Sequence, residues 1–239
     1  MRASRSRGYA SRTKGPGDDG SRCPSRRTTT GSQRGCSTYL VILCHRGSAT
    51  GRQSGGAGST ATVSIETMAW PTIEALEAVR VRLEPLAVDH ATQMVEVLSN
   101  PALYRFIGGH PPTLRELMRR YAAQAVGHSE DQTQWWLNWI VMSRAGVCAI
   151  GYVQATVEHR GAALEASIAW VIAPDFQGHG LATEAAGAML DWLKAHGVGL
   201  VVAYVHPAHA ASQAVTRKLG LRPTSLIEDG EIRWQSFPH

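Results

Sequence analysis

The stretch from Ala169 to Ala185 constrains the fold of this chain more than any other part of the sequence. An apolar run ends at Pro174, a turn containing Gly178 and Gly180 follows, and a strongly patterned helix begins at once. The two glycines let the backbone pass close to a ligand, and the first N–H groups of a helix have no partner inside it. Together with the helix dipole, these groups attract an anion. Residues 177–182 are therefore predicted to bind a phosphate or pyrophosphate.

Periodicity on both sides of this segment predicts an α+β domain, a mixed and mostly antiparallel sheet flanked by helices. Thr113 and Glu116 form the pattern of a capping box for the helix at 113–126. Asp89 is expected to cap the helix that follows it at 90–98, and Gly197 ends the strongest helix, at 181–196. Strands are predicted at 79–86, 135–143, 147–157, 163–172, 200–205, 222–227 and 231–236, and helices at 72–78, 90–98, 113–126, 181–196 and 208–219.

Residues 1–67 differ from the rest of the 239-residue chain in composition. They hold 11 Lys and Arg against 3 Asp and Glu, they are rich in Ser and Gly, and they carry almost no periodic apolar pattern. Such a segment is expected to be disordered, and Met68 is a plausible natural start. A nucleic-acid-binding arm or a transit peptide is the alternative for this tail. Residues 68–239 form the predicted domain, with 13 basic and 16 acidic residues, so composition predicts no nucleic-acid partner for it.

The sequence predicts neither a membrane segment nor a metal site. The apolar run at 39–44 is far too short to cross a bilayer. The four cysteines form no CxxC pair, so a reducing compartment and a cytoplasmic location are expected. His206 and His209 lie three residues apart, but no carboxylate or Cys joins them with the spacing of metal ligands.

Three kinds of phosphate site compete for the glycine turn. A P-loop needs GxxxxGK followed by Ser or Thr, and the chain has no such run. A dinucleotide site needs GxGxxG and an acidic residue after the next strand. Here Thr183 replaces the third glycine, and the next strand ends in Tyr204-Val205-His206. The third pattern, Gln/Arg-x-x-Gly-x-Gly/Ala, is matched at every required position by Gln177-Gly178-His179-Gly180-Leu181-Ala182.

A second segment, His206 to Arg222, has a loop after a strand, Ser212, and then Lys218-Leu219-Gly220. On both segments, residues 80–236 resemble a GNAT-type N-acetyltransferase, nearest the ribosomal-protein alanine acetyltransferases. The resemblance implies a V-shaped splay between the strands at 163–172 and 200–205. It also implies acetyl-CoA as co-substrate without a metal, and a primary amine acceptor, either a protein N-terminus or a small molecule. A monomer or homodimer is expected.

The resemblance also implies the residues of a coenzyme A site. Backbone amides of 177–182 would bind the pyrophosphate, and main-chain groups of two strand residues would bind the pantetheine arm. A hydroxyl at the helix start and two residues of the second segment would complete the slot. The cofactor-binding residues are thus expected to be Val171, Ile172, Gln177, Gly178, His179, Gly180, Leu181, Ala182, Thr183, His209 and Ser212.

Three departures from the family pattern bear on catalysis. The frequent Asn is His209, the Tyr that protonates the leaving thiolate in some branches falls at Thr216, and a frequent strand Glu falls at Ser167. Glu165 lies two residues earlier on the same strand face and is the first candidate for a general base. Ser212 is a weaker candidate for protonating the thiolate. The missing groups leave open a non-catalytic module that binds acyl-CoA as a sensor or interaction domain.

The acceptor is expected to meet the loop at Tyr104–Pro112, because loops on a rigid scaffold carry specificity. Arg105 and His110 are the residues there that would contact it. The alternating tryptophans at 135, 136 and 139 are interpreted as strand packing.

Overall fold

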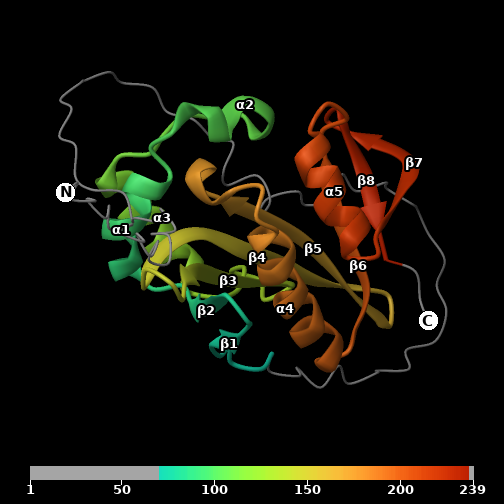
Figure 1. The fold of residues 1–239 in the computed structure, drawn as a ribbon. Coiled ribbons are helices and arrows are strands. Elements are labelled where there is room, and N and C mark those ends of the chain that lie inside the picture. Colours follow the sequence, from blue (N-terminus) through green and yellow to red (C-terminus); the bar gives the residue numbers. More distant parts are fainter. Residues whose placement is uncertain (1–69, 237–239) are drawn as a thin grey trace, which may run out of the picture.

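The computed structural model describes residues 70–236, and the predictions made for residues 1–67 lie outside this range. One sheet of eight strands forms the centre, in the order β1-β2-β3-β4-β5-β6-β8-β7 (Figure 1). This is the α+β architecture that the sequence predicts. The strands are β1 (Leu76–Glu77), β2 (Val81–Pro85), β3 (Gln134–Ser143), β4 (Cys148–Arg160), β5 (Ala163–Ile172), β6 (Val198–Val205), β7 (Arg222–Glu228) and β8 (Glu231–Gln235).

Five α-helices and three short 3-10 turns connect these strands within the described residues. The helices are α1 (Ala91–Val97), α2 (Tyr104–Ile107), α3 (Leu114–Gln124), α4 (Leu181–Ala195) and α5 (Ala210–Lys218). The 3-10 turns are η2 (Val88–His90), η3 (Pro101–Leu103) and η4 (Pro174–Phe176). Figure 1 shows α1 and α3 at the end of the sheet opposite to α5, β7 and β8, with α2 above the sheet beside α5.

The helices cover opposite faces of the central strands. Trp192 of α4 packs against Trp139 of β3 at 5.6 Å between ring centroids, so odd-numbered β3 residues face α4. Asn138 points to the other face, where it borders a hollow together with Tyr121 of α3 and Leu98, which follows α1. The sheet is therefore the middle layer between α4 on one side and the α1–α3 pair on the other.

Most elements lie where periodicity predicts them. The bounds of β5 agree at both ends, and α4 ends one residue early. The predicted capping box is also present, since the Thr113 hydroxyl accepts from Glu116 N–H and Thr113 N–H donates to the Glu116 carboxylate.

Three local predictions are wrong. The segment 72–78 is extended rather than helical, because Leu76 pairs with Leu83 and the Glu74 carbonyl accepts from Trp139 Nε1 at 2.8 Å. Asp89 does not cap α1, because it lies inside η2, where Ala87 N–H donates to His90 Nδ1 instead. Half of the loop expected at Tyr104–Pro112 is the short helix α2.

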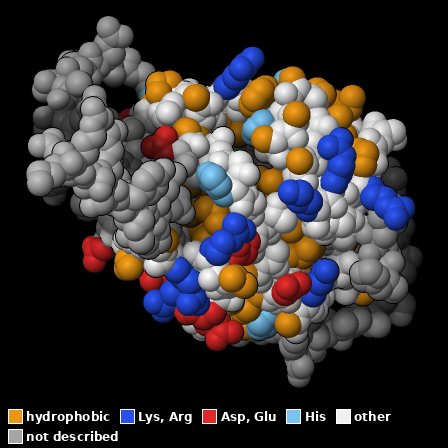
Figure 2. Space-filling view, in the orientation of Figure 1, with side chains coloured by type: hydrophobic (Ala, Val, Ile, Leu, Met, Phe, Trp, Pro, Cys, Tyr) orange, Lys and Arg blue, Asp and Glu red, His pale blue; other side chains and the backbone are white. Residues whose placement is uncertain are grey.

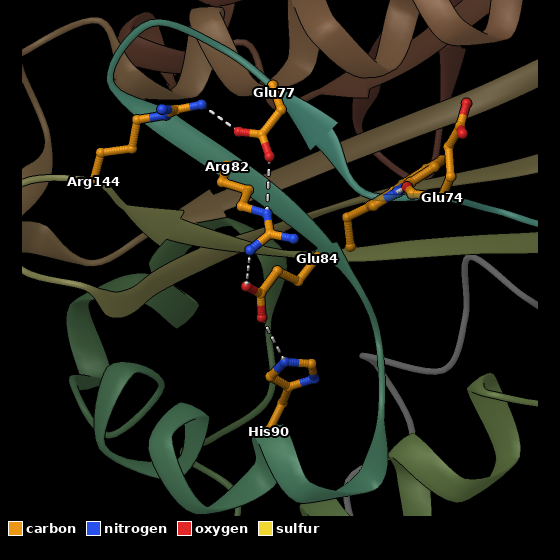
Figure 3. Close-up of polar contacts among 7 residues, drawn as sticks. Glu74, Glu77, Arg82, Glu84, His90 and Arg144 are labelled. Atoms are coloured by element: carbon orange, nitrogen blue, oxygen red, sulfur yellow. Dashed lines mark hydrogen bonds and ion pairs between the residues drawn. The ribbon is translucent and has the colours of Figure 1, made fainter.

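A chain of exposed ion pairs ties the β1–β2 edge to its neighbours (Figure 3). Glu77 binds Arg144 and also Arg82, whose Nε lies 3.0 Å from it. Arg82 then reaches Glu84 at 3.3 Å, and Glu84 contacts His90 of η2 at 3.4 Å. The chain thus links β1, β2, the β3–β4 turn and η2 on the surface.

Candidate functional site

The parallel pair β5 and β6 separates partway along its length. The two strands are paired from Leu164 with Val198 to Ser167 with Val202, and no pairing follows. Beyond this point β5 runs on to Ile172, while β6 pairs with β8 up to Val205. The last five residues of β5 therefore have β4 on one side and an open edge on the other. This is the splay that the sequence resemblance implies.

The loop from the end of β5 to α4 presents a run of unpaired backbone N–H groups. Glu184 N–H is the first to donate within the helix, to the Gly180 carbonyl at 3.1 Å. Within residues 70–236, the N–H groups of residues 178–183 have no acceptor. Gly178 and Gly180 have φ of 82° and 78°, the left-handed region that glycine adopts without strain. The turn is therefore shaped to offer consecutive donors to an anion.

Gln177 contributes to the turn through its side chain rather than through its backbone N–H. Its N–H donates to the Pro174 carbonyl at 3.1 Å, so the free donors begin one residue later than the sequence suggests. Its Nε2 donates to the Ile172 carbonyl at 2.7 Å and fixes the loop to the end of β5. The side chain of Gln177 thus sets the angle at which the strand enters the turn.

Arg80, which directly precedes β2, holds the same loop from outside. Its Nη1 donates to the His179 carbonyl at 2.8 Å, and its Nε donates to the Glu184 carboxylate at 2.7 Å. Its backbone N–H donates to that carboxylate as well, at 2.5 Å. Arg80 therefore clamps both ends of the turn. Figure 2 shows that Lys and Arg side chains are scattered over this face of the molecule.

Glu184 stays ionised in this clamp. Partial burial opposes its charge, but the hydrogen bonds from Arg80 outweigh this and lower the pKa of the carboxyl below its usual value of 4.5. A carboxylate in the first turn of α4 also interacts favourably with the helix dipole. Sequence reasoning missed Arg80, because a contact across about 100 residues leaves no local pattern.

At the end of β5, the backbone N–H and C=O groups of successive residues point alternately toward β4 and toward the open edge. The Val171 carbonyl faces β4, where an ideal Cβ built on Gly151 would lie 2.0 Å from its oxygen. The Ile172 carbonyl is held by Gln177 on the open side. By strand alternation, Trp170 and Ile172 present their main-chain groups to the splay and Val171 does not. Trp170 is thus a splay-facing residue that the sequence reasoning did not single out.

The opposite wall of the splay carries His209 and Ser212. His209 precedes α5 and stacks on Phe106 of α2 with ring centroids 4.4 Å apart. Burial lowers the pKa of His209, helped by the neighbouring His206, so the ring is neutral at pH 7. Ser212 lies half-buried in the first turn of α5. The Phe106 contact joins the predicted acceptor segment to this wall.

Glu165, predicted as a base, lies where β5 and β6 are still paired, opposite Leu200. Its carboxylate accepts from Arg233 Nη2 of β8 at 3.1 Å, and the side chain is 11% exposed. Arg105 and His110 stay near the surface, and the Arg105 guanidinium lies 5.3 Å from the Phe106 ring centroid. The structure therefore brings residues 172–183 and 209–212 to one splay, with Glu165 at its closed end and the main-chain groups of Val171 turned toward β4.

The family model of the GNAT acetyltransferase domain matches residues 80–222 of this chain. The chain therefore belongs to the GNAT family of acetyltransferases. No curated protein matches it. These comparisons confirm the family that the sequence resemblance names.

Solved structures share the fold at low sequence identity. A putative ribosomal-protein-serine acetyltransferase from Vibrio cholerae is 17% identical, with a TM-score of 0.54, and the match covers 69% of this chain and 97% of that one. RimL, a ribosomal L7/L12 alpha-N-protein acetyltransferase solved with coenzyme A, is 14% identical at a TM-score of 0.56, covering 69% and 98%. MccE, a microcin C7 self-immunity acetyltransferase solved with acetyl-CoA and AMP, is 12% identical at 0.55, covering 66% and 92%.

The described residues offer neither a metal site nor a membrane-spanning helix. No group of three or more His, Cys, Asp or Glu side chains in residues 70–236 is arranged to hold a metal ion. Within that same range, every helix is too short or too polar to cross a bilayer.

Proposed function

We propose that this chain transfers an acetyl group from acetyl-CoA to a primary amine, on a protein N-terminus or on a small molecule. The observation that carries the proposal is the run of backbone N–H groups at residues 178–183, free within the described residues and placed at the mouth of the splay. A pyrophosphate supplies anionic oxygens suited to such donors. Neighbours solved with coenzyme A and with acetyl-CoA support the same ligand here.

In this proposal the main chain of β5 orients the thioester. The amine nitrogen attacks the thioester carbonyl carbon, a C–N bond forms, and the C–S bond breaks. The attacking nitrogen loses a proton and the leaving thiolate gains one. Ile172 N–H, on the open edge of β5, would donate to the oxyanion that develops on the carbonyl oxygen. Correct positioning alone can lower such a barrier by about 7 to 11 kcal/mol.

Glu165 remains our first candidate for the base and Ser212 for the proton donor. The ion pair with Arg233 supports a competing, structural role for Glu165. Glu165→Gln keeps the size and one acceptor oxygen. If Glu165 is the base, kcat/KM should fall by about 100-fold and lose its acidic limb with pH. If it is structural, the melting temperature should fall, as in Arg233→Gln, with kcat/KM changed less than about threefold.

A non-catalytic acyl-CoA sensor or interaction module is the second candidate. It is favoured by Thr216, which stands where some family members have a Tyr. Thr216 is fully buried, and its hydroxyl donates to the Gln213 carbonyl at 2.8 Å. This hydroxyl is therefore not free to protonate a leaving thiolate.

The test uses the full chain with acetyl-CoA and a panel of amines and N-terminal peptides, and it measures free thiol and melting temperature. Thiol release that depends on the acceptor is the expected result. A rise in melting temperature without thiol from any acceptor would favour the sensor. If acetyl-CoA neither shifts the melting temperature nor reacts, both candidates fail.

A further inference from the structure

Tyr204, near the end of β6, lies on the face of the sheet opposite to α4. Trp139 faces α4, and the strand register across β4 carries this face to Trp170 of β5. The odd-numbered residues of β5 therefore face away from α4. The parallel pair of Ser167 with Val202 places the even-numbered residues of β6 on that same side. Tyr204 thus shares a face with the odd-numbered residues of β5.

Tyr204 also lies in the part of β6 that has separated from β5. The pairing ends at Val202, so Tyr204 is two residues into the splay, and Ala169 holds the corresponding position on β5. Ala169 and Tyr204 are both half-buried. On the side of α4, Ile168 and Ala203 are at most 2% exposed. The splay is therefore more open on the face of Tyr204, and the small Ala169 side chain leaves space opposite the phenol.

Three charged side chains act on the Tyr204 phenol. Arg233 of β8 pairs with Tyr204 in register and donates to the Glu165 carboxylate at 3.1 Å. The Tyr204 hydroxyl donates to the carboxylate of Glu228 on β7, and the charges of Glu165 and Arg233 also reach it. Two carboxylates and one guanidinium give this group a net charge of −1. It therefore complements a single positive charge, such as that of an ammonium group.

The Tyr204 phenol is neutral at pH 7 and has the groups needed to pass on a proton. Partial burial raises the pKa of Tyr204, and the hydrogen bond to Glu228 and the charge of that carboxylate raise it further. A hydroxyl that donates its own proton still accepts through its oxygen lone pairs. Glu228 is exposed, so its carboxylate is in contact with water. Tyr204 thus connects the open face of the splay to solvent.

We infer that Tyr204 is a further catalytic residue, which removes one proton from an acceptor that arrives as an ammonium. An N–H bond of the ammonium breaks and its proton passes to the Tyr204 oxygen. The hydroxyl proton of Tyr204 passes at the same time to the Glu228 carboxylate, which releases it to water. This inference rests on the proposed transferase function and concerns the step before attack. The proton that the nitrogen loses later, for which Glu165 is the candidate base, balances the one that the thiolate gains.

The size of the expected effect follows from the share of the acceptor that is protonated. A chain without the relay uses only the neutral amine present in solution. At pH 7 an N-terminal amine, with a pKa near 8, is protonated about 10:1, and an alkylamine, with a pKa near 10.4, about 2,500:1. Loss of the relay should therefore lower kcat/KM by up to about 10-fold for the first class and by up to about 1,000-fold for the second. Above the pKa of the amine the loss should disappear.

The experiment compares the full wild-type chain with Tyr204→Phe, using acetyl-CoA and an acceptor that wild type acetylates. kcat/KM is measured at one pH below and one above the pKa of that acceptor; for an alkylamine, a fluorinated analogue brings this pKa into the working range. We expect Tyr204→Phe to lose about 10-fold below the pKa and less than about twofold above it. Its melting temperature and its acetyl-CoA affinity should match wild type, because the ring is kept. Wild-type kcat/KM below the pKa would overturn the inference.

A second variant and two controls locate the effect in the relay. Glu228→Gln removes the final proton acceptor at an exposed position and should show the same loss below the pKa. Asp229→Asn neutralises the next carboxylate of the hairpin, at a φ of 49° that Asn also adopts, and should change nothing. Tyr121→Phe, which removes a phenol hydroxyl from α3, should also be without effect. If Asp229→Asn loses as much as Glu228→Gln, the hairpin acts through its overall charge and the relay is refuted.

The outcomes also separate this inference from the transferase proposal. If wild type acetylates an amine and Tyr204→Phe matches it at both pH values, the transferase stands and the relay falls. If the loss in Tyr204→Phe is equal at both pH values and comes with a lower melting temperature, Tyr204 is a structural residue and the relay falls as well. If wild type binds acetyl-CoA but acetylates no amine, both proposals fall.

Discussion

The two faces of the sheet are built from the same strands, yet they are filled in different ways. Toward α4, β3 and β4 present Leu137, Trp139 and Val153, which are at most 2% exposed. Toward α1 and α3, the same strands present Asn138 and Gln154, which are buried at 6% and 8% exposed. One face therefore stabilises the fold by apolar burial. The other face buries these polar groups beside apolar ones such as Ile140, at a cost in stability.

The largest effect is expected from a substitution that removes a central side chain, Trp139, from the apolar face. Trp139 is fully buried, packs on Trp192 and donates through Nε1 to the Glu74 carbonyl. Trp139→Ala should lower the free energy of unfolding by about 3 to 5 kcal/mol, measured by urea denaturation. Gln154→Leu, on the polar face, serves as the counterpart and should cost less than about 1 kcal/mol. Similar losses for the two variants would break the comparison between the faces.

A smaller loss is expected at the point where β4 meets the end of β5. A side chain at Gly151 would lie 2.0 Å from the Val171 carbonyl oxygen and 3.0 Å from the Ile172 Cα, so the backbone must shift. Gly151→Ala should destabilise the fold by about 1 to 3 kcal/mol and weaken acetyl-CoA binding, because it displaces the strand that enters the turn. Gly199→Ala is the control, since nothing lies within 4 Å of its ideal Cβ. Equal melting temperatures for the two variants would show that β5 tolerates the shift.

These contrasts also explain how far the sequence could predict the structure. The glycine turn and α4 are local, so spacing alone located them, and the same holds for β5. Alternation along β2 and the residue that precedes it puts Arg80, Arg82 and Glu84 on the same face. Nothing in the sequence indicates which of the three contacts the glycine turn. Only the fold brings Arg80 to His179 and Glu184 while Arg82 stays at the edge.

The polar hollow was missed for a related reason. Asn138 and Gln154 interrupt strands in ways that usually mark an exposed face, and only the packing of α3 over them makes them buried. The sequence reasoning chose Arg105 and His110 as acceptor residues, because they sit in a loop-like stretch. Arg120, which also lines the hollow, lies on a predicted helix, where a basic side chain ordinarily faces solvent.

A smaller effect than that of Gly151→Ala is expected from removing the hydrogen bonds by which Arg80 holds the glycine turn. Arg80→Gln removes the guanidinium that holds the His179 carbonyl and Glu184, and it should weaken acetyl-CoA binding about 10-fold by calorimetry. The pKa of Glu184 is lowered in the folded state, so its stabilising contribution is present above the unfolded pKa, near 4.5. That contribution should be lost as pH falls below this value in wild type, and it should be smaller in Arg80→Gln. An affinity unchanged by the substitution would mean that the turn keeps its shape without the clamp.

The smallest effect on stability is expected from a substitution at Arg82, two residues after Arg80. Arg82 is 48% exposed and bridges Glu77 and Glu84, which are themselves partly exposed (Figure 3). Surface ion pairs of this kind contribute about 0 to 1 kcal/mol and are screened by salt. Arg82→Gln should therefore change the free energy of unfolding by less than about 0.5 kcal/mol, with acetyl-CoA affinity unchanged. If Arg82→Gln weakens acetyl-CoA binding as much as Arg80→Gln does, the positive charge of this sheet edge supports binding, and the two hydrogen bonds from Arg80 to the turn do not explain it.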